Sequence, residues 1–448
     1  MKPLLIHEAT IVNENKKQTG SVLISEGKID TIYYKKVPRD VIQSSEIINA
    51  KGKYLFPGII DEHVHFREPG LTYKADILSE SKAAVAGGVT SYMEMPNTEP
   101  QTITTSLLDD KLSIASGQSL ANYAFYIGAT NDNLDELLRA DPEKTCAIKV
   151  FLGASTGNML ANKPGTLKHI FSEVKMLIAV HSEDEDIIQK NLQLYRKRYS
   201  DNIPVYLHPE IRSEEACYKS TVKAVELANK YNTRLHILHL STEKELELLK
   251  DCPYSKNKLI TGEVCVHHLW FDDSDYKSLG TRIKWNPAIK TRKDREALLE
   301  AVKSNKIDTI ATDHAPHTWN EKNRDYLHSP SGGPMIQHSL PAMLEMHNRN
   351  LIDLETIVEK MCHAPARIFS IGKRGFIREG YWADLVLVNP DKPWKISKDN
   401  ILYKCNWSPL EGQQFKNRIE KTFVNGQLVF DNGIINENIK GKALTFNR

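Results

Sequence analysis

The sequence predicts a (β/α)8 TIM-type barrel with a small β-sandwich domain built from both chain ends. Three observations support this fold class. The middle of the chain alternates short β-branched runs with longer amphipathic runs, it contains eight of the short runs, and both chain ends contain only short alternating runs. At 448 residues the chain can hold such a barrel, which occupies about 250 residues, together with a second domain.

The small β domain is expected over residues 1–55 and 369–448. Near the start, runs such as LLIHEATIV alternate apolar and polar residues, which is typical of strands with one buried face. Near the end, ADLVLVNP and KTFVNGQLVFDNG have the same character. The Asn-Gly pair in the second of these is a strong signal for a hairpin turn. The shared pattern predicts that the two ends form one domain.

The barrel is expected over residues 56–368. Its eight strands correspond, in chain order, to GIIDEHVHF, VTSYMEMPN, NYAFYIGAT, CAIKVFLG, MLIAVHSE, RLHILHLST, LITGEVCVHH and DTIATDHAP. Amphipathic segments between them, such as residues 72–88 and 214–231, are typical of the helices that surround a barrel. In this fold the active site forms at the carboxyl ends of the strands. The last residues of the runs are therefore the candidates for chemistry.

Several of these strand ends carry potential metal ligands. His63 and His65 are two positions apart, so in a strand both imidazoles point to the same face, into the barrel mouth. His181, His239 and Asp313 end three other runs, and this set of nitrogen and carboxylate donors suits zinc or a similar metal. The alternative is a group of hydrogen-bonded polar residues in the core, without a metal.

Other histidines are assigned by their spacing. His236 lies three positions before His239, so the two are expected on opposite faces of one strand, with His236 packed against the helices. His267 and His268 also face opposite ways and are left as structural residues or as partners that orient the ligands.

Lys149 is unusual because it lies inside the apolar run AIKVFLG. An unpaired buried ammonium costs several kcal/mol, and metal cations close to it would repel it. A neutral lysine amine can add CO₂ to give a carbamate, which is an anion able to bridge two metals. The alternative is an ordinary surface lysine.

The motifs DEHVHFREPG, MPNTEP, AIKVFLG, AVHSED, LHLST and ATDHAPHT occur in this order across the predicted barrel. As a set they resemble the cyclic amidohydrolases of the amidohydrolase superfamily, and among them the dihydroorotase group. The likeness also includes HAPARIF and ADLVLVNP, so it extends over the whole chain. The resemblance implies two Zn²⁺ ions bridged by carboxylated Lys149 and a hydroxide. It assigns His63, His65, Lys149 and Asp313 to one ion, and Lys149, His181 and His239 to the other.

The resemblance also implies the reaction, which is the reversible conversion of (S)-dihydroorotate to N-carbamoyl-L-aspartate in pyrimidine biosynthesis. The bridging hydroxide would attack the ring, with Asp313 as general acid and base. Arg67, two positions beyond His65, could hold the substrate carboxylate with two parallel hydrogen bonds, and Asn97 could share it. Asn286 and His317 match family positions that contact the ring amide and the carboxylate.

Several alternatives remain open. Arg67 could be a surface arginine paired with Glu68, and the enzyme could be another cyclic amidase, such as a dihydropyrimidinase, hydantoinase or allantoinase. A non-catalytic relative is disfavoured because such proteins lose ligands, whereas here every ligand position is filled. The segment from Gly332 to Gln337 departs from the family pattern, so its part in substrate binding is left open.

Composition excludes several other classes. Lys plus Arg (59) minus Asp plus Glu (57) gives a net charge of +2, without the basic surplus typical of nucleic-acid binding. No apolar stretch is long enough for a membrane helix, and no secretion signal is recognised. The six cysteines form no CxxC pair, which indicates reduced thiols in the cytoplasm. The expected partner is a small-molecule substrate. The oligomeric state, a homodimer included, is left open.

Overall fold

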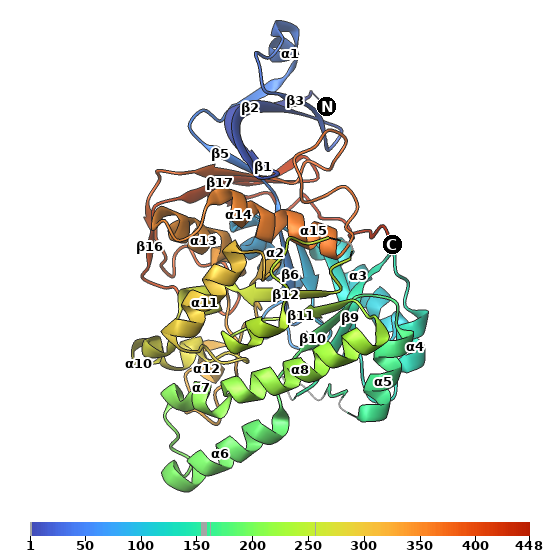
Figure 1. The fold of residues 1–448 in the computed structure, drawn as a ribbon. Helices are drawn as coiled ribbons and strands as arrows, with labels where there is room; N and C mark the ends of the chain where they lie inside the picture. The colour runs from blue at the N-terminus through green and yellow to red at the C-terminus, as the bar shows by residue number, and fades with distance from the viewer. Residues whose placement is uncertain (1, 154–158, 162, 256) are drawn as a thin grey trace.

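The computed structural model describes residues 2–153, 159–161, 163–255 and 257–448. Eight parallel strands form a barrel at its centre (Figure 1). They are β6 (Ile59–Val64), β7 (Val89–Glu94), β8 (Asn122–Gly128), β9 (Thr145–Phe151), β10 (Ile178–His181), β11 (Leu235–Ile237), β12 (Ile260–Cys265) and β13 (Thr309–Ala311). They neighbour one another in chain order from β6 to β13. Seven lie within the predicted runs, and β9 begins one residue before its run, at Thr145, so the predicted barrel is confirmed.

The barrel closes between its first and last strands. Val64 and His314 form a parallel bridge, and the His65 amide donates to the His314 carbonyl over 2.7 Å. Deeper in the barrel, the Thr312 hydroxyl donates to Asp61 Oδ2 over 2.6 Å, and burial raises the pKa of Asp61 to about 7. These bonds tie β6 to β13 directly below the residues predicted to bind metal.

Helices cover the outside of the barrel. The longer ones are α2 (Ile77–Ala86), α3 (Thr105–Gln118), α5 (Pro164–Glu173), α6 (Glu185–Tyr199), α8 (Glu214–Tyr231), α11 (Arg292–Lys303) and α13 (Ser339–Asn348). Shorter ones are α4 (Leu134–Arg139), α7 (His208–Ile211), α9 (Val266–Trp270), α10 (Tyr276–Leu279), α12 (Trp319–Lys322), α14 (Leu354–Val358) and α15 (Ala364–Ile368). Asp76 begins α2 with a capping box that includes Ser79, and Ser213 caps α8. In the described residues, no helix is long and apolar enough to cross a membrane.

The two chain ends form one nine-stranded sheet. Its strands are β1 (Leu4–Asn13), β2 (Lys16–Ser25), β3 (Lys28–Tyr33), β4 (Glu46–Asn49), β5 (Tyr54–Pro57), β14 (Leu385–Asn389), β17 (Arg418–Val424), β18 (Gln427–Asp431) and β19 (Ile434–Ile435). A short helix, α1 (Arg39–Ser44), and the pair β15 (Trp394–Lys395) and β16 (Gln414–Phe415) accompany it. Strands β5 and β14 pair in antiparallel orientation and join the N-terminal part of the sheet to the C-terminal part.

Alternate side chains of β14 pack into two different hydrophobic cores. Leu385 and Leu387 pack with Ile11 and Ile24 in the core of the small domain, so strands from both chain ends share that core. Val386 and Val388, on the other face, belong to the core of the barrel. The predicted Asn-Gly hairpin joins β17 to β18, with positive φ at both residues of its turn.

The final residues of the chain leave the sheet and return to the barrel. The Leu444 amide donates to the Tyr123 carbonyl over 2.8 Å, and Arg448 donates to the Thr145 carbonyl over 3.0 Å. Phe446 packs with Phe369 against residues inside the barrel. The tail of the segment assigned from sequence to the β domain therefore contacts the barrel.

A buried polar network fastens the β domain to the barrel. Asp384 forms an ion pair with Arg374 and accepts hydrogen bonds from the Asn122 side chain (3.2 Å) and the Asn425 amide (2.7 Å). Arg374 in turn donates to the Asn425 side chain over 2.9 Å. Asp384 and Arg374 are each 4% exposed, so their charges depend on one another.

We predict that Asp384→Ala destabilises the protein by about 3–5 kcal/mol, because it leaves the buried Arg374 guanidinium without its counter-charge. Urea unfolding followed by circular dichroism measures the loss. Asp391→Ala is the control, because Asp391 is an exposed partner of Lys416 at 3.9 Å and should change stability by less than about 1 kcal/mol. Equal stability of the two variants would contradict a structural role for the network.

Candidate active site

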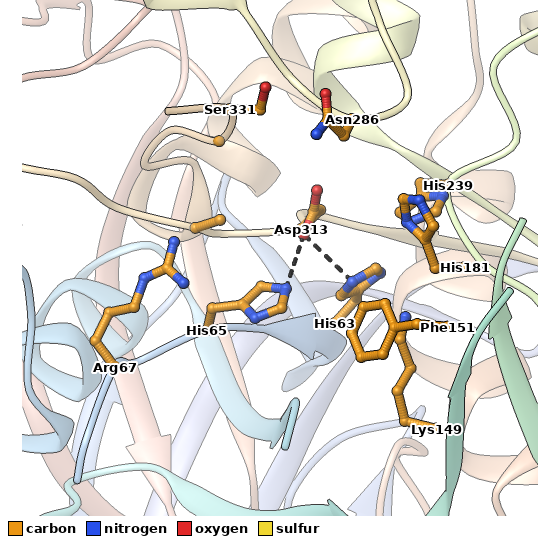
Figure 2. Close-up of a pocket in the computed structure, with 12 residues that line it drawn as sticks. His63, His65, Arg67, Lys149, Phe151, His181, His239, Asn286, Asp313 and Ser331 are labelled. Atoms are coloured by element: carbon orange, nitrogen blue, oxygen red, sulfur yellow. Dashed lines mark hydrogen bonds and ion pairs between the residues drawn. The ribbon is translucent and has the colours of Figure 1, made fainter. Parts of the chain in front are cut away.

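A pocket lies at the carboxyl ends of the barrel strands (Figure 2). It is lined by His63, His65, Arg67, Lys149, Phe151, His181, His239, Asn286, Asp313, Ala315, Ser331 and Gly332. Eight of the ten site residues named from the sequence are among them. The other two, Asn97 and His317, stand behind this lining and contact it.

His63, His65 and Asp313 form one cluster of donor atoms. The Asp313 Oδ1 atom lies 3.3 Å from His63 Nε2 and 3.1 Å from His65 Nε2 (Figure 2). Burial by itself would raise the pKa of Asp313, but the facing imidazoles outweigh this effect and hold it well below its usual range. Burial lowers the pKa of His65 to about 4, so its ring is neutral near pH 7. A neutral imidazole can offer a nitrogen lone pair to a metal.

His181 and His239 form a second pair of donors. His181 Nδ1 lies 3.0 Å from His239 Nε2, and the two rings meet edge to face. His181 is the last residue of β10, and His239 lies two positions beyond the end of β11. The ring of His239 is also 5.3 Å from that of His63, so the two clusters adjoin.

Three oxygen acceptors hold the imidazoles from behind. His63 Nδ1 is 2.8 Å from Glu263 Oε1, and His65 Nδ1 is 2.7 Å from Asn97 Oδ1. His181 Nε2 is 3.0 Å from Glu183 Oε2. Each acceptor takes one ring nitrogen and leaves the other directed at the pocket, as is common for histidines that bind metals.

Glu183 and Glu263 were not identified from the sequence. Glu183 follows His181 by two positions, and Glu263 lies within the apolar strand β12, so a carboxylate inside a predicted strand was the available signal. Both are fully buried. Burial would raise the pKa of Glu183, but Arg212 and His181 lower it to about 2, so it is ionised. Glu263 also accepts the backbone amide of His239 over 3.0 Å.

Lys149 projects from β9 into the same pocket (Figure 2). It is 1% exposed, and its amine lies 4.6 Å above the Phe151 ring. Burial lowers the pKa of Lys149 to about 7, although Asp313 and Glu263 oppose this shift. No described side chain is within ion-pair distance of the amine. The amine is therefore partly neutral near pH 7, the form that reacts with CO₂.

The spacing of the donor atoms fits divalent metal ions. Two ligands of a tetrahedral zinc, each at about 2.0–2.1 Å, lie roughly 3.3 Å from one another. The separations from His63 and His65 to Asp313 are 3.3 and 3.1 Å, and the separation from His181 to His239 is 3.0 Å. The acceptors behind the His63, His65 and His181 rings direct the lone pair of the other ring nitrogen into the pocket. The donor set therefore suits zinc or a similar borderline metal.

Three of the pocket residues have a left-handed backbone. Arg67, His239 and Asp313 have φ values of 70°, 41° and 43°. Such conformations cost about 1–3 kcal/mol in residues other than glycine and persist where the surrounding structure enforces them. Here the Glu263 carboxylate holds the amide of His239, and the Thr312 side chain bonds the amide of His314 over 3.1 Å. The strand ends are bent so that these side chains face the pocket.

The substrate-binding candidates occupy another side of the pocket. Arg67 is 1% exposed, and its Nε donates to the Pro316 carbonyl over 3.1 Å. Its Nη2 lies 3.2 Å from His317 Nε2, and its Nη1 makes no hydrogen bond with a described residue. Asn286 Oδ1 is also buried without a partner in the described residues. These unsatisfied groups can receive a carboxylate and an amide N–H, respectively.

His236 requires a correction. It does not face the helices, because its ring lies 3.9 Å from Glu263 and packs edge to face on Phe369, inside the barrel. β11 ends at Ile237, and the left-handed turn at His239 breaks the alternation on which the prediction depended. His236 therefore lies inside the barrel below His239 and donates no ligand to the pocket.

His267 and His268 support the segment that carries Asn286. His267 stacks on Trp285 with a centroid separation of 4.4 Å, and His268 Nε2 lies 3.2 Å from the Pro287 carbonyl. Neither lines the pocket.

The segment from Gly332 to Gln337, which departs from the family pattern, has one part at the pocket and another part in the core. Gly332 and the preceding Ser331 line the pocket, and neither was named from the sequence as a binding residue. A Cβ at Gly332, where φ is +117°, would lie 2.7 Å from the Ala315 carbonyl. Met335 and Ile336 are buried instead, and the Met335 amide lies 3.0 Å from His314 Nδ1. Only the start of the segment reaches the site.

Comparisons with known proteins give a consistent family. Residues 54–429 match the amidohydrolase family. A dihydroorotase of Pyrococcus furiosus is 32% identical, over 95% of this chain and 92% of that protein. One of Halobacterium salinarum is 34% identical, over 82% of this chain and 84% of that protein.

Solved structures share the fold. An L-hydantoinase (dihydropyrimidinase) from Arthrobacter aurescens has a TM-score of 0.91 and 26% identity, and it covers 97% of this chain and 98% of that one. A dihydropyrimidinase from Brevibacillus agri, at 24% identity and a TM-score of 0.88, matches the full length of both chains and supports the fold alone.

We predict that Glu263→Gln weakens zinc binding by about 10- to 100-fold, because it removes the charged acceptor that orients His63 and holds the His239 amide. Titration of the metal-free protein with zinc against a chelator measures the affinity. The contact between His169 and Glu173 on the surface offers a matched control, because Glu173→Gln alters an exposed imidazole–carboxylate pair at 2.6 Å. Unchanged zinc affinity in Glu263→Gln would show that this carboxylate does not orient the ligands.

Proposed function

This chain belongs to the amidohydrolase family, and from that premise we propose that it is a dihydroorotase. It would interconvert (S)-dihydroorotate and N-carbamoyl-L-aspartate, a reaction of pyrimidine biosynthesis. Relatives that carry this name are 30–34% identical over most of their length. The observation that carries the choice of substrate is the buried Arg67 guanidinium, which lies beside the cluster of imidazoles and carboxylates.

Arg67 suits an anionic substrate for an electrostatic reason. No ion pair of the described residues involves its guanidinium. Burial of this unpaired charge costs free energy until an anion binds beside it. A carboxylate that enters the pocket would supply that charge and accept hydrogen bonds from the planar fork. His317, in contact with Arg67, would take part in the same binding, and Asn286 would contact the ring amide. Asn97 would act through His65, whose ring it holds.

We further propose that two zinc ions bind in this pocket. His63, His65 and Asp313 would hold one, His181 and His239 would hold the other, and carboxylated Lys149 would bridge them. When bound, the ions would lower the pKa of a bridging water towards neutrality and polarise the ring carbonyl. The support comes from the donor separations of 3.0–3.3 Å and from the buried Lys149 amine.

The residues of the chain supply binding and proton transfer. Arg67 would fix the substrate carboxylate and so hold the ring amide carbon near Asp313. As the water oxygen forms a bond to that carbon, Asp313 accepts the water proton. The ring C–N bond then breaks, and Asp313 returns the proton to the departing nitrogen. The water oxygen remains in the new carboxylate, and ring closure follows the same steps in reverse.

A second candidate is another cyclic amidase. It is favoured by the likeness to the L-hydantoinase structure at a TM-score of 0.91. Hydantoins and dihydrouracil carry no carboxylate, so a buried arginine in their binding site would remain without a counter-charge. Turnover of these compounds without turnover of dihydroorotate would select this alternative.

Replacement of Lys149 tests the bridge. We expect Lys149→Ala to lose bound zinc and activity, because no other described side chain can take the place of the bridging carbamate. Short carboxylic acids should restore part of both, since a carboxylate can bridge two metals. Elemental analysis gives the zinc content, and ¹³C NMR after addition of labelled bicarbonate detects a carbamate in the wild type alone. Full zinc content and activity without added acid would refute the bridge.

Replacement of Arg67 tests the substrate. Arg67→Lys keeps the charge but removes the fork, so we expect KM for dihydroorotate to rise at least about tenfold with zinc content unchanged. Hydrolysis of dihydroorotate, hydantoin and dihydrouracil is measured for the wild type and the variant under the same conditions. Lys82→Met is the control, because Lys82 pairs with Glu437 on the outside of α2. An unaltered KM would mean that the carboxylate binds elsewhere.

A further inference from the structure

Lys74 contacts His317 behind Arg67, on the side of the pocket where the substrate carboxylate is proposed to bind (the carboxylate-binding side). It has no role in the family motifs quoted above. It lies in the loop between β6 and α2, which also carries Arg67. Two consecutive backbone turns fold this loop, with the Leu71 amide bonded to the Arg67 carbonyl and the Lys74 amide bonded to the Leu71 carbonyl, each over 3.0 Å. These turns bring the two cations to the same imidazole. Lys74 Nζ is 3.1 Å from His317 Nδ1, and Arg67 Nη2 is 3.2 Å from His317 Nε2.

The contact with Lys74 determines which nitrogen of His317 carries the proton. An ammonium can only donate, so beside charged Lys74 the His317 Nδ1 atom accepts and the ring proton lies on Nε2. Arg67 Nη2 can also only donate, so in this tautomer its 3.2 Å contact with Nε2 is no hydrogen bond, whereas the opposite tautomer would leave both Lys74 and the Ser331 carbonyl without a partner on the ring. Nε2 is 3.1 Å from the Ser331 carbonyl, which accepts that proton. Ser331 and Arg67 both line the pocket, and a Cβ on Gly332 would lie 3.5 Å from Nε2. The N–H of His317 is therefore directed to the wall where Arg67 would hold a carboxylate.

The surroundings of Lys74 keep it in this position. Its amine is 3.1 Å from Glu321 Oε1, and Glu321 is itself held by the hydroxyl and amide of Thr318. The side chain of Lys74 is only 11% exposed. The Trp407 indole donates to the His317 carbonyl over 2.8 Å, which fixes the backbone of the imidazole. Both partners of the contact are thus held in place without any ligand.

We propose that Lys74 is a positioning residue that holds His317 as a neutral ring with its proton on Nε2, so that no ring lone pair faces the substrate carboxylate bound at Arg67. This inference rests on the proposed dihydroorotase function. The charged groups that face His317 are Arg67 and Lys74 from the β6–α2 loop and Lys322 from α12. Burial and these three cations lower the pKa of His317 well below its usual range. This lowering favours the neutral form of the ring.

Lys74→Met tests the inference, because Met keeps the length of the side chain and removes the donor and the charge. At pH 8 we expect KM for dihydroorotate to rise about tenfold, the loss expected for one charge-assisted hydrogen bond, with kcat and zinc content close to wild type. Loss of the Lys74 charge removes one of the three cations that lower the pKa of His317, so more of the mutant ring takes up a proton and attracts the carboxylate as the pH falls from 8 to 5.5. The ratio of mutant to wild-type KM should therefore shrink. Lys74→Arg should restore the wild-type KM, and Lys82→Met should leave it unchanged.

A second measurement does not depend on turnover. ¹⁵N NMR of histidine-labelled protein, with His317 assigned by its loss in His317→Asn, reports the protonated nitrogen. We expect Nε2–H in the wild type and a mixture of tautomers in Lys74→Met or, if that variant does not fold, in Lys74→Ala. An unchanged tautomer, an unchanged KM, or equal losses of kcat, zinc and KM would overturn the inference. Failure of the wild type to hydrolyse dihydroorotate would refute the proposed function, while the NMR result would still test the contact.

Discussion

The hydrogen bond between His63 Nδ1 and the buried Glu263 carboxylate is the contact on which the geometry of the barrel mouth depends. The same carboxylate oxygen accepts the backbone amide of His239, so one group fixes a ring from β6 and the bent end of β11. In a dry interior an imidazole needs an acceptor for its N–H, and that acceptor decides where the other nitrogen points. Asn97 and Glu183 do the same for His65 and His181. The donor atoms converge because their partners behind them are fixed.

Charge is distributed unequally around the pocket. Carboxylates lie behind the imidazoles, where they favour cations at the ligand atoms. On the other side, Arg67, Lys74 and Lys322 face His317, and Lys322 donates to the Lys284 and Pro330 carbonyls. Asp313 lines the pocket between these two regions (Figure 2). This arrangement suits a substrate that presents a polarisable carbonyl to one side and a carboxylate to the other.

The β domain contributes to the site as well as to stability. Its segment between β14 and β17 carries Trp407, whose indole holds the His317 carbonyl. A Cβ on Gly333 would lie 3.1 Å from the same indole and 2.7 Å from Trp285, so the pocket wall is packed between the two rings. The ion pair of Asp384 with Arg374 connects this domain to β8 through Asn122. The C-terminal part of this domain therefore helps to shape the side of the pocket that carries Arg67.

The sequence by itself determined the order of the eight strands and the residues at their ends. Short β-branched runs that alternate with amphipathic runs are a local signal for strands and helices, and the topology of a barrel places the carboxyl ends of all strands around one mouth. It identified His63, His65, Lys149, His181, His239 and Asp313 on that basis. It did not identify Glu183, Glu263 or Lys74, since a buried carboxylate or a loop lysine has no pattern that reveals its partner. It also misplaced His236, because the left-handed turn at His239 follows from a bond to Glu263 in the neighbouring strand. Only the tertiary structure decided how the ring nitrogens are directed, because that depends on acceptors far away along the chain.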